Sequence, residues 1–437
     1  MPLRHLLVGS GPASIAAAEA IRSRDLTAEI TCIGAEPEGY YSRPGLAYYL
    51  AKEVPEDSLF PFSQHDIAAL GVTFVPETVV SLDRAERTVT LESGRTLPYD
   101  RLLLATGSIA NPVRVPGANL DGVVKLDDLS DARDLARRAG RGKTAVVVGG
   151  GITALEIVEG LCSRHVDVHY LMRKRRYWGN VLSETESRLV EDGLRQRGVE
   201  IHYDTRLTEI LGDRGKVAGV RTEGADSIHC DMVAVAIGVH PRIELAQDAG
   251  LECARGVLVD EFLATSDPDI YAAGDIAEVF DPGTQRRSLE VLWSSAVAKG
   301  RIAGFNMAGG PAHAYDGGAP LNVTRLAGFK LTIMGTVGSG EDSDLEGIVR
   351  GDSEAWRQAG EATMVESQAG DAHVRLALGT DTIVGGVVMG DQALSFPLQD
   401  LIGAGANAGP IIERLKEPGA PIARIVDDFW SEWSARA

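Results

Sequence analysis

The clearest sign of a ligand-binding site is a group of glycines that follows an apolar run near the N-terminus. The run 6–8 leads into Gly9-Ser10-Gly11-Pro12-Ala13-Ser14 and a helical stretch, and a second apolar run, 30–33, ends near Glu36. In such a strand–turn–helix, the first Gly permits a sharp bend, the second lets a phosphate approach, and the helix N-terminus attracts the pyrophosphate. Ser14 is small enough for close helix packing, and Glu36 can accept hydrogen bonds from ribose hydroxyls. The predicted dinucleotide-binding residues are Gly9, Gly11, Pro12, Ala13, Ser14 and Glu36.

A second strand–turn–helix begins 140 residues later. The apolar run 144–148 precedes Gly149-Gly150-Gly151, a helical stretch and another apolar run at 168–172. An internal repeat of this pattern is far more informative than one copy. Two dinucleotides in one chain favour hydride transfer from a nicotinamide to a bound flavin. The residues predicted to hold the second dinucleotide are Gly149, Gly151, Ile152, Thr153 and Ala154.

The end of the second apolar run, at Met172, bears on the choice of nucleotide. It is followed by Arg173-Lys174-Arg175-Arg176, with no carboxylate where an NAD-specific site carries one. Cations at this point favour the 2′-phosphate of NADPH through charge-assisted hydrogen bonds. We therefore predict NADPH over NADH, with Arg173 as a contact. A solvated basic run is the alternative.

Composition limits the functional classes. A chain of 437 residues is too long to fold around a single hydrophobic core, so two or three domains are expected. The net charge of −19 argues against nucleic acid or anionic membranes as partners. The four cysteines lie far apart and the nine histidines show no metal-binding spacing, so no disulfide and no metal site is expected. The chain enters its first strand without room for a signal peptide and has no apolar run of ~18–20 residues. These features predict a soluble, cytoplasmic protein.

The remaining segments surround the two repeats. A strand at 101–105 ends in Thr106-Gly107, and a strand at 270–273 delivers Gly274-Asp275 to a helix start. A helix is expected at 294–307. Beyond residue 320 we expect strands at 330–334 and 373–378, separated by an acidic loop or hairpin at 341–366.

These motifs resemble, in order and spacing over residues 1–310, the FAD-dependent pyridine nucleotide–disulfide oxidoreductase superfamily. Its branch of ferredoxin and rubredoxin reductases, nitrite-reductase flavin modules and NADH oxidases is the most similar. The matching segments are 9–14, Ala105-Thr106-Gly107, 149–151, Ala236-Ile237-Gly238 and Ala273-Gly274-Asp275.

The resemblance implies an α/β fold with two Rossmann-like, glutathione-reductase-like dinucleotide-binding domains and a C-terminal α+β domain. The FAD domain would be discontinuous, 1–115 and 242–319, with the NAD(P) domain inserted at 116–241. Residues 320–437 would form the interface domain of a homodimer.

The resemblance also implies roles for single residues. Asp275 would hold a flavin ribityl hydroxyl, the alternative being a helix N-cap only. Glu156 would lie near the flavin and nicotinamide rings, with Tyr48 or Lys52 at the position of a partner lysine. Trp293 would lie near the isoalloxazine, although core packing explains it equally well. The further predicted cofactor contacts are Arg43, Pro44, Ala105, Thr106, Gly107, Ile237, Gly238 and Gly274.

The loop 42–46 narrows the chemistry. NADH oxidases and coenzyme A disulfide reductases carry a redox cysteine there, whereas this chain has Ser42-Arg43-Pro44, which resembles the ferredoxin and rubredoxin reductases. A solvated Arg43 is the alternative. Without a thiol, electrons must leave the flavin directly. We expect an FAD-dependent NAD(P)H oxidoreductase that serves a small redox protein such as ferredoxin or rubredoxin. The alternatives are an oxidase or small-molecule reductase using the flavin directly, or a flavoprotein subunit of a larger complex.

Overall fold

The computed structural model describes residues 2–224, 227–281, 286–317, 319–337, 362–370 and 372–436. The chain forms two compact units, each with its own core. The first comprises 1–49, 54–109 and 239–317, and the second 50–53, 110–238 and 318–437. The second unit holds both the predicted NAD(P) segment and the predicted last domain, so that boundary stays a prediction. Within the described residues, no helix is long and apolar enough to cross a membrane.

A five-stranded parallel sheet forms the core of the first unit. Its order is β19-β7-β1-β2-β3. The last four residues of β1 and the last three of β7 are buried, as expected for parallel strands covered on both faces. The strands are β1 (Arg4–Val8), β2 (Glu29–Ile33), β3 (Val72–Val75), β7 (Arg101–Leu104) and β19 (Ile270–Ala272).

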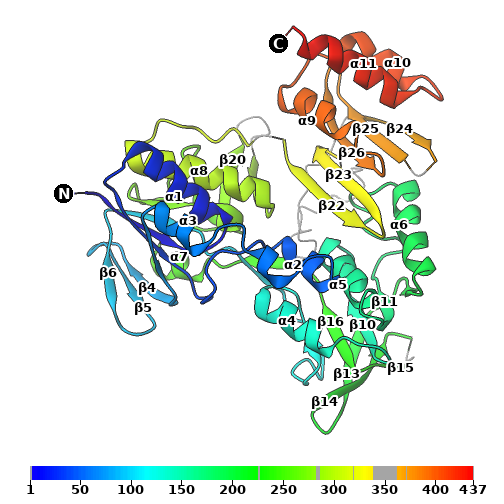
Figure 1. Ribbon diagram of the computed structural model, residues 1–437, viewed down its shortest axis with the longest axis horizontal. Coiled ribbons are helices and arrows are strands. Elements are labelled where there is room, and N and C mark those ends of the chain that lie inside the picture. Colours follow the sequence, from blue (N-terminus) through cyan, green and yellow to red (C-terminus); the bar gives the residue numbers. More distant parts are fainter. Residues whose placement is uncertain are drawn as a thin grey trace. The chain divides into compact units, whose positions relative to one another are not determined.

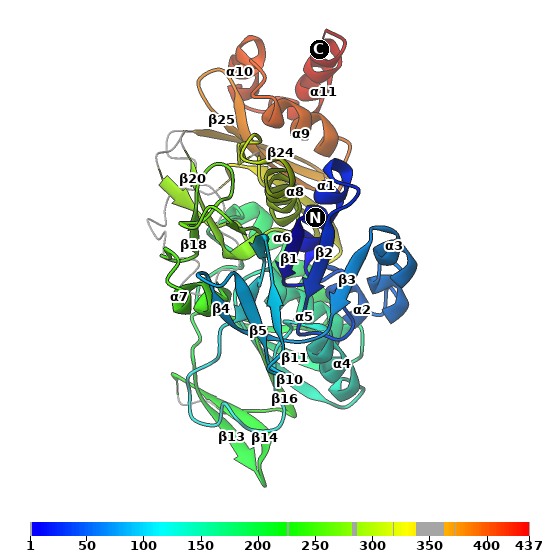
Figure 2. The same cartoon turned by 90° about the vertical axis from the view of Figure 1, so that its left-hand side faces the viewer.

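Two helices, α1 (Pro12–Arg24) and α8 (Trp293–Gly309), pack side by side in the first unit (Figures 1 and 2). Small residues permit the close approach. A Cβ at Gly300 would lie 2.1 Å from the Ala13 carbonyl oxygen, and one at Gly304 would lie 2.5 Å from that of Ala17. The helix predicted at 294–307 is thus confirmed, and its glycines are packing residues.

The second unit repeats the design of the first sheet. Its parallel sheet has the order β12-β11-β10-β16-β9, with the Gly-turn strand β10 again in the middle. A three-stranded antiparallel sheet follows the third parallel strand in each copy, formed by β4, β5 and β6 in the first and by β13, β14 and β15 in the second. The parallel strands are β9 (Val123–Val124), β10 (Thr144–Val148), β11 (Asp167–Leu171), β12 (Glu200–His202) and β16 (Met232–Val235). The predicted internal repeat is therefore confirmed in three dimensions.

The last part of the second unit is an antiparallel sheet covered by helices. The sheet has the order β22-β23-β26-β25-β24, and α9 (Ser395–Gly403), α10 (Gly409–Lys416) and α11 (Ile422–Ser434) share its apolar core (Figure 1). The half-buried Trp430 packs on this core and donates from Nε1 to Asp400 at 3.0 Å. The predicted α+β character is confirmed. Most of the acidic stretch 341–366 lies outside the described residues, but 363–366 begin β24 and are strand.

Two small sheets complete the strand pairing: β8 pairs with β17, and β20 lies between β18 and β21. The bounds of these strands, and of all other elements not yet given, follow. Their bounds are α2 (Gly45–Leu50), α3 (Gln64–Ala69), α4 (Leu129–Arg138), α5 (Ile152–Cys162), α6 (Glu184–Gln196), α7 (Glu244–Asp248), η1 (Glu56–Leu59), η2 (Gly274–Ile276), β4 (Val79–Asp83), β5 (Thr88–Leu91), β6 (Thr96–Pro98), β8 (Ser108–Ala110), β13 (Leu207–Asp213), β14 (Lys216–Thr222), β15 (Ser227–His229), β17 (Val239–Pro241), β18 (Val257–Val259), β20 (Ala277–Asp281), β21 (Arg286–Ser288), β22 (Leu321–Leu326), β23 (Phe329–Gly335), β24 (Thr363–Ala369), β25 (Ala372–Leu378) and β26 (Ile383–Met389).

Candidate cofactor-binding sites

The first turn uses its two glycines differently. Gly9 has a φ of +116°, and a Cβ there would lie 2.1 Å from the Ala105 carbonyl oxygen. Its N–H donates to the Ile33 carbonyl at 2.7 Å, so Gly9 locks the turn to the sheet. A Cβ at Gly11 would meet nothing within 4 Å. The backbone therefore needs Gly9, whereas Gly11 faces open space.

The start of α1 offers unused polar groups. Gly11 is its N-cap and provides no side-chain hydrogen bond, and Pro12 occupies the first turn. Ser14 is fully buried, and its Oγ has no hydrogen-bond partner among the described residues. A helix N-terminus with free N–H groups and a partial positive charge binds phosphate oxygens well. These residues fit the pyrophosphate of a dinucleotide.

Glu36 and Arg43 lie together in the first unit. The Glu36 carboxylate accepts from the Tyr41 hydroxyl at 2.5 Å and pairs with the Arg43 guanidinium. The Arg43 guanidinium also lies 5.3 Å from the Tyr41 ring centroid. Arg43 is exposed, with 40% of its side chain accessible, and its ion pair places it beside Glu36 after β2, so the alternative of a solvated charge stays open. The contacts of Glu36 to ribose, and of Arg43 and Pro44 to FAD, stay predictions.

The ends of the neighbouring strands β7 and β19 position two further predicted residues, Thr106 and Asp275, in the first unit. Ala273 N donates to the Leu104 carbonyl at 3.0 Å, and the Thr106 hydroxyl donates to the Arg242 carbonyl at 2.8 Å. The Asp275 carboxylate accepts from the Ser108 hydroxyl at 2.8 Å. Asp275 lies inside η2, whose N-cap is Ala273, so the alternative of Asp275 as a helix N-cap is wrong.

The second turn repeats the geometry of the first. A Cβ at Gly149 would lie 2.1 Å from the Ala236 carbonyl oxygen, whereas one at Gly151 would meet nothing within 4 Å. Gly151 is the N-cap of α5 and provides no side-chain hydrogen bond. Ile152 and Ala154 are buried behind the turn, with Thr153 half-buried between them. The arrangement fits a second pyrophosphate.

Residues 237 and 238 follow strand β16 of the second parallel sheet, near this turn. Asn111 donates from its backbone N–H to the Gly238 carbonyl at 2.8 Å and from its side chain to the Ile237 carbonyl at 3.3 Å. Ile237 packs against the core cluster of β10 and β16. Both predicted residues therefore lie at the carboxyl end of the sheet, where α/β proteins bind their ligands.

Sequence comparison identifies the protein family that carries these two sites. The profile of the family described as pyridine nucleotide-disulphide oxidoreductase matches residues 3–300. The chain belongs to this family. Membership confirms the predicted glutathione-reductase-like fold class, the oxidoreductase class and the cofactor pair of FAD and a pyridine nucleotide.

Individual relatives support the assignment of this oxidoreductase. The biphenyl dioxygenase system ferredoxin--NAD(+) reductase component of Paraburkholderia xenovorans (strain LB400) is 34% identical over 356 residues, which are 80% of this chain and 84% of the relative. The assimilatory nitrate reductase electron transfer subunit of Bacillus subtilis (strain 168) is 30% identical over 76% of this chain, but the match spans only 43% of that relative. The ferredoxin reductase for the CYP199A2 system from Rhodopseudomonas palustris has a TM-score of 0.85 and 25% identity, and the match covers 97% of this chain and 99% of that one.

The predicted catalytic residues of the oxidoreductase fall in both units. Glu156 lies half-buried on α5 and Lys52 is exposed after α2 in the second unit, whereas Tyr48 and Trp293 belong to the first. Trp293 begins α8, is 49% exposed and donates from Nε1 to the Tyr40 hydroxyl at 3.4 Å. Core packing is therefore the wrong account of Trp293. The catalytic roles of all four residues stay predictions.

The basic run after β11 is exposed on the second unit. Arg173, Lys174 and Arg175 are all exposed, and Arg175 Nε pairs with Asp204 Oδ2 at 3.1 Å. Asp204 follows β12 and was not found by sequence reasoning, because it enters from a different strand. One of the cations is thus partly neutralised, while the strand end itself still carries no carboxylate.

A buried lysine on α8 was also missed. Lys299 is fully buried, and its Nζ lies 3.9 Å from Glu290 Oε2 and 5.8 Å from the Tyr315 ring centroid. Within the part of the chain that the structure describes, its Nζ makes no hydrogen bond. Glu290 in turn accepts from Ser295 at 2.6 Å and from Tyr315 at 2.8 Å. Burial lowers the pKa of Lys299, although Glu290 and Asp275 oppose the shift. A lone lysine inside an apolar, glycine-containing helix was the available sequence signal.

The four cysteines of the oxidoreductase are all free thiols. Burial raises the pKa of Cys32 to about 12, that of Cys162 to about 11 and that of Cys230 to about 12, and it also raises that of Cys253. Cys32 lies under the first turn and donates from Sγ to the Gly9 carbonyl at 3.4 Å. None of these thiols is disposed to form the thiolate that redox chemistry needs.

Proposed function

We propose that this oxidoreductase takes electrons from NAD(P)H through FAD and passes them to a small redox protein of the ferredoxin or rubredoxin type. The observation that carries the proposal is the state of the thiols: all four are free and have raised pKa values, and the loop 42–46 holds none. A disulfide relay, which the family name includes, needs a reactive cysteine pair. Without such a relay, electrons pass directly from the flavin to the acceptor.

The chain's own residues would hold and orient the cofactors. Gly11 and the start of α1 would hold the FAD pyrophosphate, and Asp275, oriented by Ser108, would accept from a ribityl hydroxyl. Gly151 and the start of α5 would hold the nicotinamide dinucleotide in the same way. Bound FAD supplies the redox chemistry, since flavins accept hydride and can release electrons singly.

The relatives support the choice of acceptor. The Paraburkholderia relative, named a ferredoxin--NAD(+) reductase, matches over 84% of its length. The Ectopseudomonas oleovorans relative named rubredoxin-NAD(+) reductase is 31% identical over 80% of its length. Both names describe electron transfer to a small iron protein.

An acceptor screen tests the proposal. The purified holoenzyme is reduced anaerobically with NADPH or NADH and mixed with ferredoxins, rubredoxins, quinones or oxygen, while flavin absorbance is followed. We expect reoxidation by a ferredoxin or rubredoxin to exceed that by oxygen by orders of magnitude. Equal or faster reoxidation by oxygen would identify an oxidase instead. Slow reoxidation by every acceptor, with stable co-purification of another chain, would identify a subunit of a larger redox complex.

We also propose NADPH as the preferred donor, because four cations and no carboxylate follow Met172. Arg173→Gln should raise the KM for NADPH about tenfold and leave that for NADH nearly unchanged, since only NADPH carries the 2′-phosphate. Arg188→Gln, an exposed arginine on α6 paired with Glu184, is the matched control. A wild-type kcat/KM that is equal for both nucleotides, or higher for NADH, would contradict the preference.

Assembly and location complete the proposal. We propose a cytoplasmic homodimer, on the basis of the family resemblance of residues 320–437 and of four cysteines that are all free. Light scattering coupled to gel filtration should give twice the chain mass of 46.4 kDa. A monomer at micromolar concentration would refute the dimer.

A further inference from the structure

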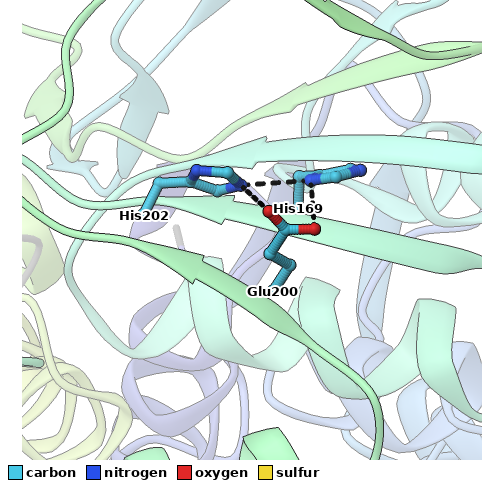
Figure 3. A group of neighbouring side chains, drawn as sticks. All are labelled: His169, Glu200 and His202. Carbon is cyan, nitrogen blue, oxygen red and sulfur yellow. Dashed lines mark hydrogen bonds and ion pairs between the residues drawn. The ribbon is translucent and has the colours of Figure 1, made fainter.

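Three side chains with metal-binding atoms meet on the parallel sheet of the second unit. Figure 3 shows His169 from β11 beside Glu200 and His202 from β12. His169 lies opposite Glu200 in the strand register, and His202 follows Glu200 by two residues. Residues two apart in a strand point to the same face, so the register places all three side chains on one face of the sheet.

The donor atoms of the three side chains lie close together. His169 Nδ1 lies 3.1 Å from His202 Nε2 and 3.4 Å from Glu200 Oε2. His202 Nε2 lies 3.5 Å from Glu200 Oε1. With metal–ligand bonds of about 2.0–2.1 Å, two ligands of a tetrahedral zinc ion lie about 3.3–3.4 Å apart. The contacts of His169 and His202 end on different oxygens of Glu200, and one donor atom from each of the three residues lies within 4.8 Å of the other two, a spacing from which one ion could be bound by all three.

Either protons or a cation can occupy the space between these atoms. If both facing ring nitrogens carry hydrogen, their N–H groups oppose each other across 3.1 Å. If only one carries hydrogen, it donates to the other nitrogen across 3.1 Å, and this hydrogen bond leaves the nearby Glu200 carboxylate without a proton between it and the rings. A divalent cation among the three atoms accepts all the lone pairs at once.

We propose that His169, Glu200 and His202 bind a zinc ion, with water as the fourth ligand. Two imidazoles and one carboxylate form a donor set that suits zinc. The side chains of His169 and His202 are 23% and 24% exposed and that of Glu200 is 64% exposed, which leaves an entry path and room for the water. Since β12 is an edge strand of its sheet, the ion would fasten it to β11. Its role is structural and separate from electron transfer.

Isothermal titration tests the site. The untagged holoenzyme is stripped with a chelator, desalted and titrated with zinc chloride. We expect one zinc per chain and a higher melting temperature, because a ligand of the native state stabilises it. His169→Gln and His202→Gln should each weaken binding by at least about 10–100-fold. His229→Gln, an exposed histidine on β15 of the same unit, is the control and should bind zinc like the wild type.

The possible results of this titration either support or overturn the zinc site. Absence of saturable zinc binding to the wild type, or unchanged affinity in both ligand variants, would overturn the site. Circular dichroism and flavin content show that each variant is folded. Glu200→Gln changes an exposed side chain and provides a second variant that keeps the fold, with an expected loss of at least tenfold in affinity. Because the readout is metal binding, its failure leaves the proposed electron transfer untouched.

Discussion

At the scale of single residues, each Gly turn separates a backbone requirement from a ligand requirement. Gly9→Ala should abolish soluble, flavin-containing protein, because the new Cβ meets the Ala105 carbonyl and the backbone has a positive φ. Gly11→Ala should fold normally and bind FAD at least about tenfold more weakly, because only the approaching phosphate meets the new methyl group. Flavin content and thermal unfolding measure both. A Gly11→Ala variant with wild-type FAD affinity would show that no phosphate lies there.

The buried cation on α8 gives a second prediction at this scale. The pKa of Lys299 is lowered from 10.5, so the unfolded chain binds more protons there than the folded one at pH values between the two pKa values. Stability contributed by this site therefore rises with pH through that interval. Lys299→Met should melt at a higher temperature than the wild type at neutral pH, and the difference should shrink as the pH approaches 10.5.

Melting curves at a series of pH values check this. The exposed Lys216 on β14, changed to Met, is the control and should show no such pH-dependent difference. A lower melting temperature for Lys299→Met at neutral pH would instead show that the cation stabilises Glu290 more than its burial costs.

At the scale of elements, one buried ion pair joins α6 to β25 within the second unit. Arg375 Nε pairs with Glu186 Oε1 at 3.0 Å, and the guanidinium also donates to the carbonyls of Val337 at 2.9 Å and Val181 at 2.6 Å. His373 Nε2 lies 3.2 Å from the same carboxylate. Two segments almost 190 residues apart in the chain thus share one buried polar network.

Removing the arginine should be costly. Arg375→Met leaves a buried carboxylate with too few partners, and we expect a loss of about 3–5 kcal/mol in the free energy of unfolding. Arg188→Met removes an exposed pair from the same helix and should change it by less than about 1 kcal/mol. Urea unfolding measures both. A loss below about 1 kcal/mol for Arg375→Met would mean that the network does not hold the two elements together.

The same network predicts a pH dependence. Burial alone raises the pKa of Glu186, but Arg375 and His373 together hold it below its ordinary value of 4.5. A carboxylate with a lowered folded pKa contributes stability that is present above pH 4.5 and is lost as the pH falls through the folded pKa. The wild type should therefore lose stability below pH 4.5 more steeply than Glu186→Gln, as measured by urea midpoints. Parallel pH profiles would contradict this.

The elements near the two turns could be predicted from the sequence, because apolar runs and glycines act locally. The helix at 294–307 and the strands that flank both turns follow from such patterns. The partners of Glu36 and Arg175, and the cluster of His169 with Glu200 and His202, could not be found from spacing along the chain. They depend on strand register and loop closure, which bring residues from different elements together.

At the scale of the whole molecule, two units with separate cores carry the two nucleotide turns. Saturation with FAD should raise the unfolding temperature of the transition that involves 1–49, 54–109 and 239–317, with a stabilisation of about 2.7 kcal/mol at a hundredfold excess over Kd. NADP+ should act on the other transition. Calorimetry combined with limited proteolysis assigns the transitions. One transition that both ligands shift equally would show that the units unfold together.

A Cβ on either first glycine, Gly9 or Gly149, would lie 2.1 Å from a carbonyl oxygen, that of Ala105 after β7 or that of Ala236 after β16. The two sheets also share the order of four strands, β7-β1-β2-β3 in one and β16-β10-β11-β12 in the other. In evolutionary terms, such agreement is what tandem copying of one ancestral gene segment leaves behind, with the second copy placed between β7 and β19 of the first. The two copies differ after their second strands, where one carries Glu36 and the other Arg173. We therefore expect that a preference for different nucleotides at the two turns requires different side chains but no change of the backbone.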